Sequence, residues 1–231
     1  MSRPLIVAID GPAGAGKSTV SKLLARRLGF SLVDTGAIYR CVALAARRRS
    51  LALDDDAALG ALLASLTITF KVEGEHNHVF LDGADVSQDI RTPENSLAAS
   101  QVSSHKVVRD GLLELQRRLA LQSGKGAILE GRDIGTVVFP DADVKFFLFA
   151  DPGVRARRRY EELFEKGKEQ PFANVLHEQE KRDKEDSERE VAPLKPAADA
   201  LRVDSSALPL SDVVHLMESR IREVVAARGA R

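Results

Sequence analysis

This 231-residue chain has a single cysteine and no long apolar run. Its single cysteine, Cys41, excludes a disulfide within the chain, and the surrounding "IYRCVALAA" favours a buried helix position over a nucleophile. No apolar run reaches the roughly 18 residues that a membrane span needs, and the N-terminus enters a strand-like segment without a signal-peptide pattern. We therefore expect a cytoplasmic protein with no membrane partner.

Net charge is also missing, since 34 lysines and arginines balance 34 aspartates and glutamates. A dedicated nucleic-acid-binding protein normally carries a basic excess, so no nucleic-acid partner is expected and any anion site must be local. The neutral charge and the lack of an obvious apolar surface stripe make a monomer the expected state.

Short apolar runs alternate with amphipathic helix patterns along most of the chain. The runs at 5–9, 31–34, 126–131, 144–150 and 200–206 predict five strands. Helix patterns between them, such as 17–28 and 37–49, indicate parallel βαβ units, so the predicted fold class is α/β with a central five-stranded parallel sheet flanked by helices.

Two segments depart from this alternation. Residues 66–87 alternate with a period of two and contain glycine turns, which predicts a small antiparallel β insertion. A helix is expected from Pro93 to about Gln122, with a break near Ser103 and Ser104. Residues 155–190 are highly charged, which predicts a helix, a turn and a second helix; a mobile lid and a solvated helical hairpin explain this composition equally well.

The stretch "GPAGAGKST" satisfies the phosphate-loop pattern G-x-x-x-x-G-K-[ST] between a predicted strand and a predicted helix. Glycines let backbone N–H groups turn around a polyphosphate, Lys17 reaches the β and γ oxygens, and Ser18 ligates Mg²⁺. The predicted ATP-binding residues here are Gly11, Pro12, Ala13, Gly14, Ala15, Gly16, Lys17, Ser18 and Thr19. We therefore expect bound ATP with Mg²⁺, the alternative being a glycine-rich turn without a ligand.

A phosphate loop alone does not separate GTPases, large ATPases and small-molecule kinases. The sequence has no N-K-x-D tetrapeptide, which argues against a GTPase. A large ATPase would show an acid at a strand end, but three acids lie at the ends of predicted strands, Asp34, Glu130 and Asp151, so this criterion does not discriminate.

Arginines stand beside small polar residues at several predicted strand and helix ends: Arg40, Arg109, Arg132, Arg182 and Arg189. Each alone could form a surface ion pair. Together they suit a second phosphate group, because each pair of like unit charges costs about 4 kcal/mol at ~4 Å with an effective dielectric constant of ~20. An acceptor phosphate needs no general base, since its oxygens are largely ionised at neutral pH.

The segment "GRDIGT" favours a ligand role most clearly, because Arg132 and Asp133 directly follow a predicted buried strand. Arg182, Asp186 and Arg189 share one predicted helix face, which a ladder of salt bridges explains equally well. His76 and His78 alternate on a predicted strand without a third metal ligand, so we expect exposed strand residues there.

The segments "IDGPAGAGKST", "DTGAIYR", "ASQVS", "EGRDIGTVVFPDADVKFFL" and "RDKEDSEREVAPLKPAADALRVDSS" together resemble the bacterial cytidylate kinases, which are nucleoside monophosphate kinases. The resemblance extends nearly end to end. It implies a phosphoryl transfer from ATP·Mg to CMP, and to dCMP, that yields the diphosphate and ADP. It also implies a P-loop core at 1–65, 93–156 and 191–231, a monophosphate-binding insertion at 66–92 and a lid at 157–190.

The resemblance assigns roles by position. Thr35, Tyr39 and Arg40 match the segment that holds the acceptor; Arg40, Arg132 and Arg189 match arginines on its phosphate; Ser100, Arg109 and Asp133 match residues that recognise cytosine; Arg182 and Asp186 match contacts to the sugar; Arg158 matches a clamp on the ATP phosphates. Lys17, Arg132, Asp133 and Arg189 are the expected catalytic residues. A carboxylate suits cytosine, because it can accept the N4 amine that uracil lacks.

Two positions depart from the family pattern. The chain has Ala13 where the family often has serine, and Glu130 where it often has aspartate, so Glu130 is left out of the expected site. A kinase of the same build for UMP, AMP or a non-nucleotide acid is the nearest alternative. A P-loop regulatory or nucleic-acid-linked ATPase is the alternative from another class.

Overall fold

The computed structural model describes residues 3–73, 76–165 and 167–229. Their contacts divide the chain into two compact parts: a larger part formed by residues 1–33 and 117–231, and a smaller part formed by residues 34–116. Among the residues described, no helix is both long enough and apolar enough to cross a membrane.

The larger part is built on a five-stranded sheet with the order β2-β6-β1-β7-β8. Its strands are β1 (Leu5–Asp10), β2 (Ser31–Asp34), β6 (Gly126–Gly131), β7 (Val144–Phe149) and β8 (Leu201–Asp204). Strand β1 pairs in parallel with β6 and β7, and β7 pairs in parallel with β8. All five predicted strands and the parallel sheet are confirmed, and β1 lies at the centre.

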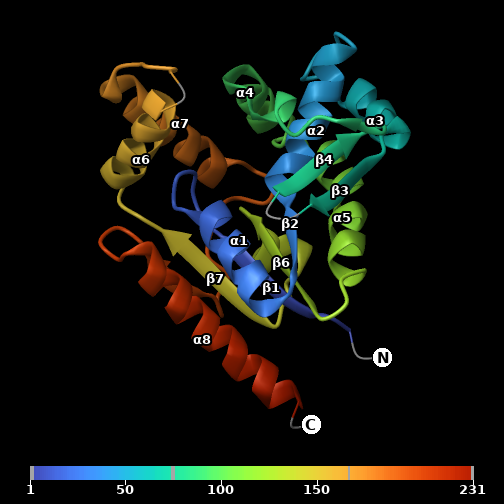
Figure 1. Cartoon of the computed structure of the whole chain (residues 1–231). Coiled ribbons are helices and arrows are strands. Elements are labelled where there is room, and N and C mark those ends of the chain that lie inside the picture. Colours follow the sequence, from blue (N-terminus) through green and yellow to red (C-terminus); the bar gives the residue numbers. More distant parts are fainter. Residues whose placement is uncertain (1–2, 74–75, 166, 230–231) are drawn as a thin grey trace. The chain divides into compact units, whose positions relative to one another are not determined.

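One face of this sheet is covered by α1 (Lys17–Leu28) and α8 (Leu210–Gly229), which lie side by side in Figure 1. Alternate residues of the strands pack against these helices, and Leu24 of α1 and Met217 of α8 are fully buried among them. Burying such a side chain contributes about 1.5–3 kcal/mol. This packing holds the C-terminal end of β1, where the phosphate loop begins.

The helical hairpin expected after β7 is present as α6 (Pro152–Glu165) and α7 (Phe172–Glu188). The two helices share a small core in which Ala156, Leu163 and Val175 are buried. Tyr160 and Phe172 pack against this core and contact each other edge to face. The larger part also contains a π-helical segment, η2 (Ile134–Val138), directly after β6. A lid motion of the hairpin stays a prediction.

The smaller part combines helices with a separate antiparallel sheet. It contains α2 (Thr35–Arg48), α3 (Asp56–Ser65), β3 (Ile68–Glu73), β4 (His76–Leu81), β5 (Ala84–Asp85), the 3₁₀ turn η1 (Asp89–Arg91), α4 (Pro93–Val102) and most of α5 (Lys106–Leu121). The order β3-β4-β5 confirms the predicted insertion, and the turn at Asp82–Gly83 has positive φ at both residues, as a tight hairpin requires. The helix break near Ser103 is confirmed.

Helix α2 begins at Thr35, two residues before the predicted start. The side chain of Asp34 accepts a hydrogen bond from the backbone N–H of Ala37 at 3.0 Å and so caps the helix. On this helix, Cys41 is fully buried, and burial raises the pKa of its thiol to about 12. The prediction that Cys41 occupies a buried helix position is confirmed.

Candidate active site

The phosphate loop connects β1 to α1 with a backbone that only glycine adopts easily. Gly14 and Gly16 have φ angles of 74° and 90°, and Gly11 has 149°. A Cβ atom on Gly11 would lie 1.9 Å from the carbonyl oxygen of Leu148, so the loop passes too close to β7 for any side chain there. The strand, loop and helix expected from the sequence are all present.

Lys17 is buried at the first position of α1 and folds back over the loop. Its Nζ donates hydrogen bonds to the carbonyl oxygens of Gly11 at 2.8 Å and Pro12 at 2.7 Å. Burial, together with the positive charge of Arg132 and Arg182, lowers the pKa of the Lys17 ammonium well below its ordinary value, against the opposing effect of Glu130. A negatively charged ligand would stabilise these three cations.

Ser18 contacts an acid that the sequence interpretation left out. Its Oγ donates a hydrogen bond to Oε2 of Glu130 at 2.8 Å, and Glu130 is buried at the end of β6. The sequence did contain a signal, since Glu130 lies at the end of a predicted strand, but Asp34 and Asp151 also lie at strand ends. The sheet order excludes Asp34, because β2 does not neighbour β1, but β6 and β7 both do. Only the hydrogen bond from Ser18 selects Glu130 over Asp151.

Arg132, Asp186 and Arg189 come together although 54 residues separate the first two. The Nε of Arg132 donates to Oδ2 of Asp186 at 2.8 Å, and Nη1 of Arg189 lies 3.7 Å from Oδ1 of the same carboxylate. Burial acts to raise the pKa of Asp186, but the charges of Arg132, Arg182 and Arg189 outweigh it and hold the pKa below its usual value. Asp186 thus forms a hydrogen bond with Arg132 of the segment "GRDIGT", in addition to its contact with Arg189. A ladder of salt bridges within one helix does not account for this contact.

Arg155 is a second residue that the sequence interpretation missed. It is buried at the start of α6, where its Nη1 donates to the carbonyl oxygen of Ala13 at 3.1 Å and lies 2.7 Å from Oδ2 of Asp183 on α7. A Cβ on Gly14 would lie 3.1 Å from Cβ of Arg155, so the loop passes close to α6. Arg155 lies in the run "RARRR" at 155–159, and nothing in the sequence distinguishes it from the other arginines of that run.

Arg158, the predicted clamp on the ATP phosphates, contacts the loop after β8. Its Nη2 donates to the carbonyl oxygen of Ser205 at 2.6 Å, and Oγ of Ser205 donates to the carbonyl oxygen of Ala15 at 3.1 Å. Arg158 therefore reaches the phosphate loop through Ser205, and its direct contact with ATP stays a prediction.

The remaining predicted acceptor-binding residues lie in the smaller part. Thr35 and Tyr39 are buried on α2, and the guanidinium of Arg109 lies 5.3 Å from the centre of the Tyr39 ring. Nη1 of Arg109 donates to the carbonyl oxygen of Ser103 at 2.8 Å, and Oγ of Ser103 donates to that of Ser100. One cluster thus contains Tyr39, Arg109 and the end of α4 that carries Ser100. Arg40 is partly exposed.

Asn95 connects the helices of this cluster. Its Nδ2 donates to the carbonyl oxygens of Arg40 at 3.0 Å and Ile90 at 3.2 Å, and its side chain is fully buried. Asn95→Leu should lower the free energy of unfolding by about 1–3 kcal/mol, because it leaves two carbonyl groups without this donor. Chemical denaturation measures this, with the exposed Asn174→Leu on α7 as control. Equal midpoints for the two variants would contradict the prediction.

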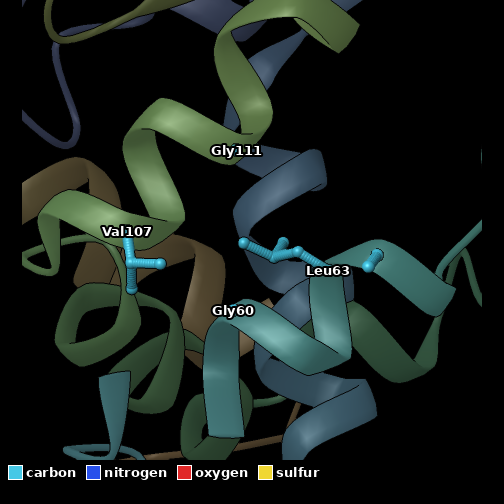
Figure 2. A pocket seen from close by; sticks show the side chains of 5 residues that line it. Gly60, Leu63, Val107 and Gly111 are labelled. Carbon is cyan, nitrogen blue, oxygen red and sulfur yellow. The ribbon is translucent and has the colours of Figure 1, made fainter. Parts of the chain in front are cut away.

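An apolar groove of about 420 Å³ lies between α3 and α5 of the smaller part (Figure 2). All five residues that line it are apolar or glycine: Gly60, Leu63, Ala64, Val107 and Gly111. These residues carry no side-chain charge that could balance the negative charge of a nucleotide phosphate. No group of three or more His, Cys, Asp or Glu side chains suited to hold a metal occurs within the described ranges.

The parallel sheet, the glycine loop at its central strand, the Ser18–Glu130 pair and the cations around Lys17 define a P-loop phosphotransferase. A family model described as cytidylate kinase matches residues 7–223. The chain belongs to the cytidylate kinase family.

Individual relatives agree with this assignment. The chain is 51% identical over 222 residues to a cytidylate kinase of Geobacter sp. strain M21, a match that covers 96% of this chain and 94% of that protein. It is 54% identical over 221 residues to a cytidylate kinase of Geobacter sulfurreducens, with the same coverage. A crystal structure of an uncharacterised protein from Eubacterium ventriosum shares the fold, with a TM-score of 0.52 and 14% identity over 94% of this chain and 98% of that one.

Proposed function

We propose that the protein transfers the γ-phosphoryl group of ATP, bound with Mg²⁺, to CMP, and to dCMP as a second acceptor, yielding ADP and the cytidine diphosphate. The observation that carries the proposal is the group of cations beside the phosphate loop, where Arg132 and Arg182 lie close enough to lower the pKa of buried Lys17. Glu130 and Asp10 offset part of the repulsion among these cations, and a bound polyphosphate would offset more of it.

Two phosphate chains must approach each other in this reaction, and their mutual repulsion has to be offset. Lys17 is proposed to stabilise the β- and γ-phosphates of ATP, and Arg132 and Arg189 the acceptor phosphate. Charge on the transferred group spreads over its oxygens in an in-line transition state, so fixed cations stabilise that state without gaining or losing a proton. The ionised acceptor phosphate is itself the nucleophile.

Release of the cations from their present partners is part of the proposal. Lys17 now bonds two loop carbonyls, and Arg132 and Arg189 now contact Asp186. When nucleotides bind, phosphate oxygens replace these acceptors. Asp186 is then available to accept hydrogen bonds from the sugar hydroxyls, the role that its match to the family implies.

Mg²⁺ suits the residues present. Ser18 Oγ and the Glu130 carboxylate are hard oxygen donors 2.8 Å apart, and Mg²⁺ needs only one or two protein ligands because it keeps several waters and binds the phosphates of the substrate. Ser18 would hold the ion directly and Glu130 would orient Ser18 or a bound water. When bound, the ion neutralises charge on the β and γ oxygens.

Glu130→Gln should raise the Mg²⁺ concentration needed for half-maximal rate by about 10–100-fold, since it removes the carboxylate that orients Ser18. An Mg²⁺ titration at saturating nucleotides measures this. Glu223→Gln, which changes an exposed glutamate on α8, is the matched control. An unchanged Mg²⁺ requirement in Glu130→Gln would assign Glu130 a purely structural role.

Initial rates of ADP formation with CMP, dCMP, UMP and AMP test the acceptor. We expect CMP and dCMP to be phosphorylated far faster than UMP, because Asp133 can accept the cytosine amine but finds no donor on uracil at that position. Faster rates with UMP or AMP would assign another acceptor. Hydrolysis of ATP without any acceptor, with salt-dependent binding to DNA or RNA, would instead indicate a nucleic-acid-linked ATPase.

A further inference from the structure

Asp10 is a buried carboxylate to which no role has yet been assigned. It is the last residue of central strand β1, directly before the phosphate loop, and is 4% exposed. Its Oδ1 accepts a hydrogen bond from the backbone N–H of Ile134 at 2.8 Å, and its Oδ2 accepts one from that of Gly135 at 2.7 Å. Both oxygens therefore bond to one short segment 124 residues away in the sequence.

That segment is the start of η2, the π-helical turn after "GRD". The N–H groups at the start of a helix have no partner within it. Later in the turn, the N–H groups of Val137 and Val138 donate to the carbonyl oxygen of Asp133. Asp10 thus supplies the acceptors that the first two N–H groups lack. At the opposite end, Nε of Arg117 donates to the carbonyl oxygen of Val138 at 2.9 Å, so side chains from other elements hold the turn at both ends.

We propose that Asp10 is a positioning residue for phosphoryl transfer. Its carboxylate anchors the backbone of Ile134 and Gly135, and this anchor sets the positions of the adjacent Arg132 and Asp133 relative to Lys17. Asp10 itself contacts no substrate in this proposal. The kinetic part rests on the proposed function, since it assigns Arg132 and Asp133 to the acceptor nucleotide.

The charges around Asp10 fit this role. Burial and the nearby charge of Asp133 raise the pKa of its carboxyl, and the two N–H groups and Lys17 lower it, with a net result of about 6. At neutral pH the group is thus mostly ionised, which suits a carboxylate that accepts two N–H bonds. The ionised carboxylate also lies between the phosphate loop and "GRDIGT", so one residue connects the donor and acceptor sides of the site.

Asp10→Asn is the sharpest test, because the amide keeps the shape but turns one of the two acceptors into a donor that faces an N–H group. We expect the KM for CMP to rise and kcat to fall, with a combined loss of about 10–100-fold in kcat/KM for CMP. Misplacement of a reacting group by about 1 Å can cause a loss of this size. The KM for ATP should change by less than about threefold, because the bonds of the loop itself remain. A purely structural role would reduce the amount of active enzyme and leave the KM for CMP unchanged.

Asp143→Asn is the matched control. Oδ2 of Asp143 also accepts a backbone N–H, that of Ile6 at 2.8 Å, but near the N-terminal end of the same strand. This variant makes the same change of charge beside β1, but its remaining amide oxygen can still accept the Ile6 N–H, so it should keep the KM for CMP of the unchanged protein. Equal kinetic effects in the two variants would overturn the proposal.

Amide hydrogen exchange provides a readout that does not depend on activity. In the unchanged protein, the amides of Ile134 and Gly135 should be protected as strongly as those of β1, and Asp10→Asn should speed exchange across 133–138 while β1 stays protected. Rapid exchange of both amides in the unchanged protein would overturn the proposal even if the variant did not fold. If exchange behaves as expected but CMP is not a substrate, the proposed function fails and the anchoring role of Asp10 stands.

Discussion

Replacing Lys17 with alanine is expected to lower kcat for CMP phosphorylation by about 10²–10³-fold or more, the size of effect seen when a fixed electrostatic group is removed from a transition state. Lys17 is the buried cation of the phosphate loop, and its Nζ already lies among acceptors at 2.7 and 2.8 Å, so it is preorganised for phosphate oxygens. A coupled assay of ADP release measures the change.

The fold should survive this substitution. Burial and the nearby arginines make the charged form of Lys17 unfavourable, as its lowered pKa shows, so the loss of the ammonium removes an electrostatic cost together with two hydrogen bonds. Lys22→Ala on the exposed face of the same helix is the control, with an expected rate near that of the unchanged protein. A near-normal rate in Lys17→Ala, with a normal melting curve, would remove Lys17 from the reaction.

Arg132→Ala is expected to raise the KM for CMP and to lower kcat, with a combined loss of about 10²–10³-fold in kcat/KM. The guanidinium offsets repulsion between the two phosphate groups, and alanine leaves that repulsion in place. Arg132→Lys should recover only part of the loss, because an ammonium keeps the charge but cannot form two parallel hydrogen bonds to a phosphate. Steady-state kinetics with CMP varied at saturating ATP separates kcat from KM.

Arg132→Ala should also lower the stability of the fold, by an amount that depends on pH. Without Arg132, the Asp186 carboxylate loses a hydrogen bond of 2.8 Å and a neighbouring positive charge, and its pKa should rise. The stability that a lowered carboxyl pKa supplies is present above the unfolded-state pKa and is lost as pH falls through the folded-state value. Arg132→Ala should therefore lower the melting temperature more at pH 7 than at a pH well below 3.8, the ordinary value for aspartate. Arg220→Ala, at an exposed ion pair on α8, should change neither kinetics nor melting. Unaltered kcat/KM in Arg132→Ala would assign its guanidinium to Asp186 alone.

Much of the fold was predictable because the decisive signals are local. Buried strands appear as short apolar runs, the β insertion as a change of period, and the loop as glycines at the positions where φ is positive. Lys17 and Ser18 follow from the same pattern. The start of α2 was predicted two residues late, because Asp34 caps the helix from a position that looks like the end of a strand.

The contacts within the site were less predictable. Glu130 could not be selected from three strand-end acids, Arg155 could not be told from its neighbours, and Asp10 looked like the end of a strand without a role. Each acquires its partner from a segment more than 100 residues away: Ser18 for Glu130, Ala13 for Arg155 and Ile134 for Asp10. No local pattern carries such information.

By itself, the sequence therefore determined the class of fold, the phosphate loop and the family, since these depend on short-range spacing and on motifs. Only the tertiary structure decided which charges neighbour one another, because the strand order β2-β6-β1-β7-β8 places segments side by side that are far apart along the chain. The pKa values of Lys17, Asp186 and Asp10 depend on burial and on those neighbours, and neither exists before the chain has folded.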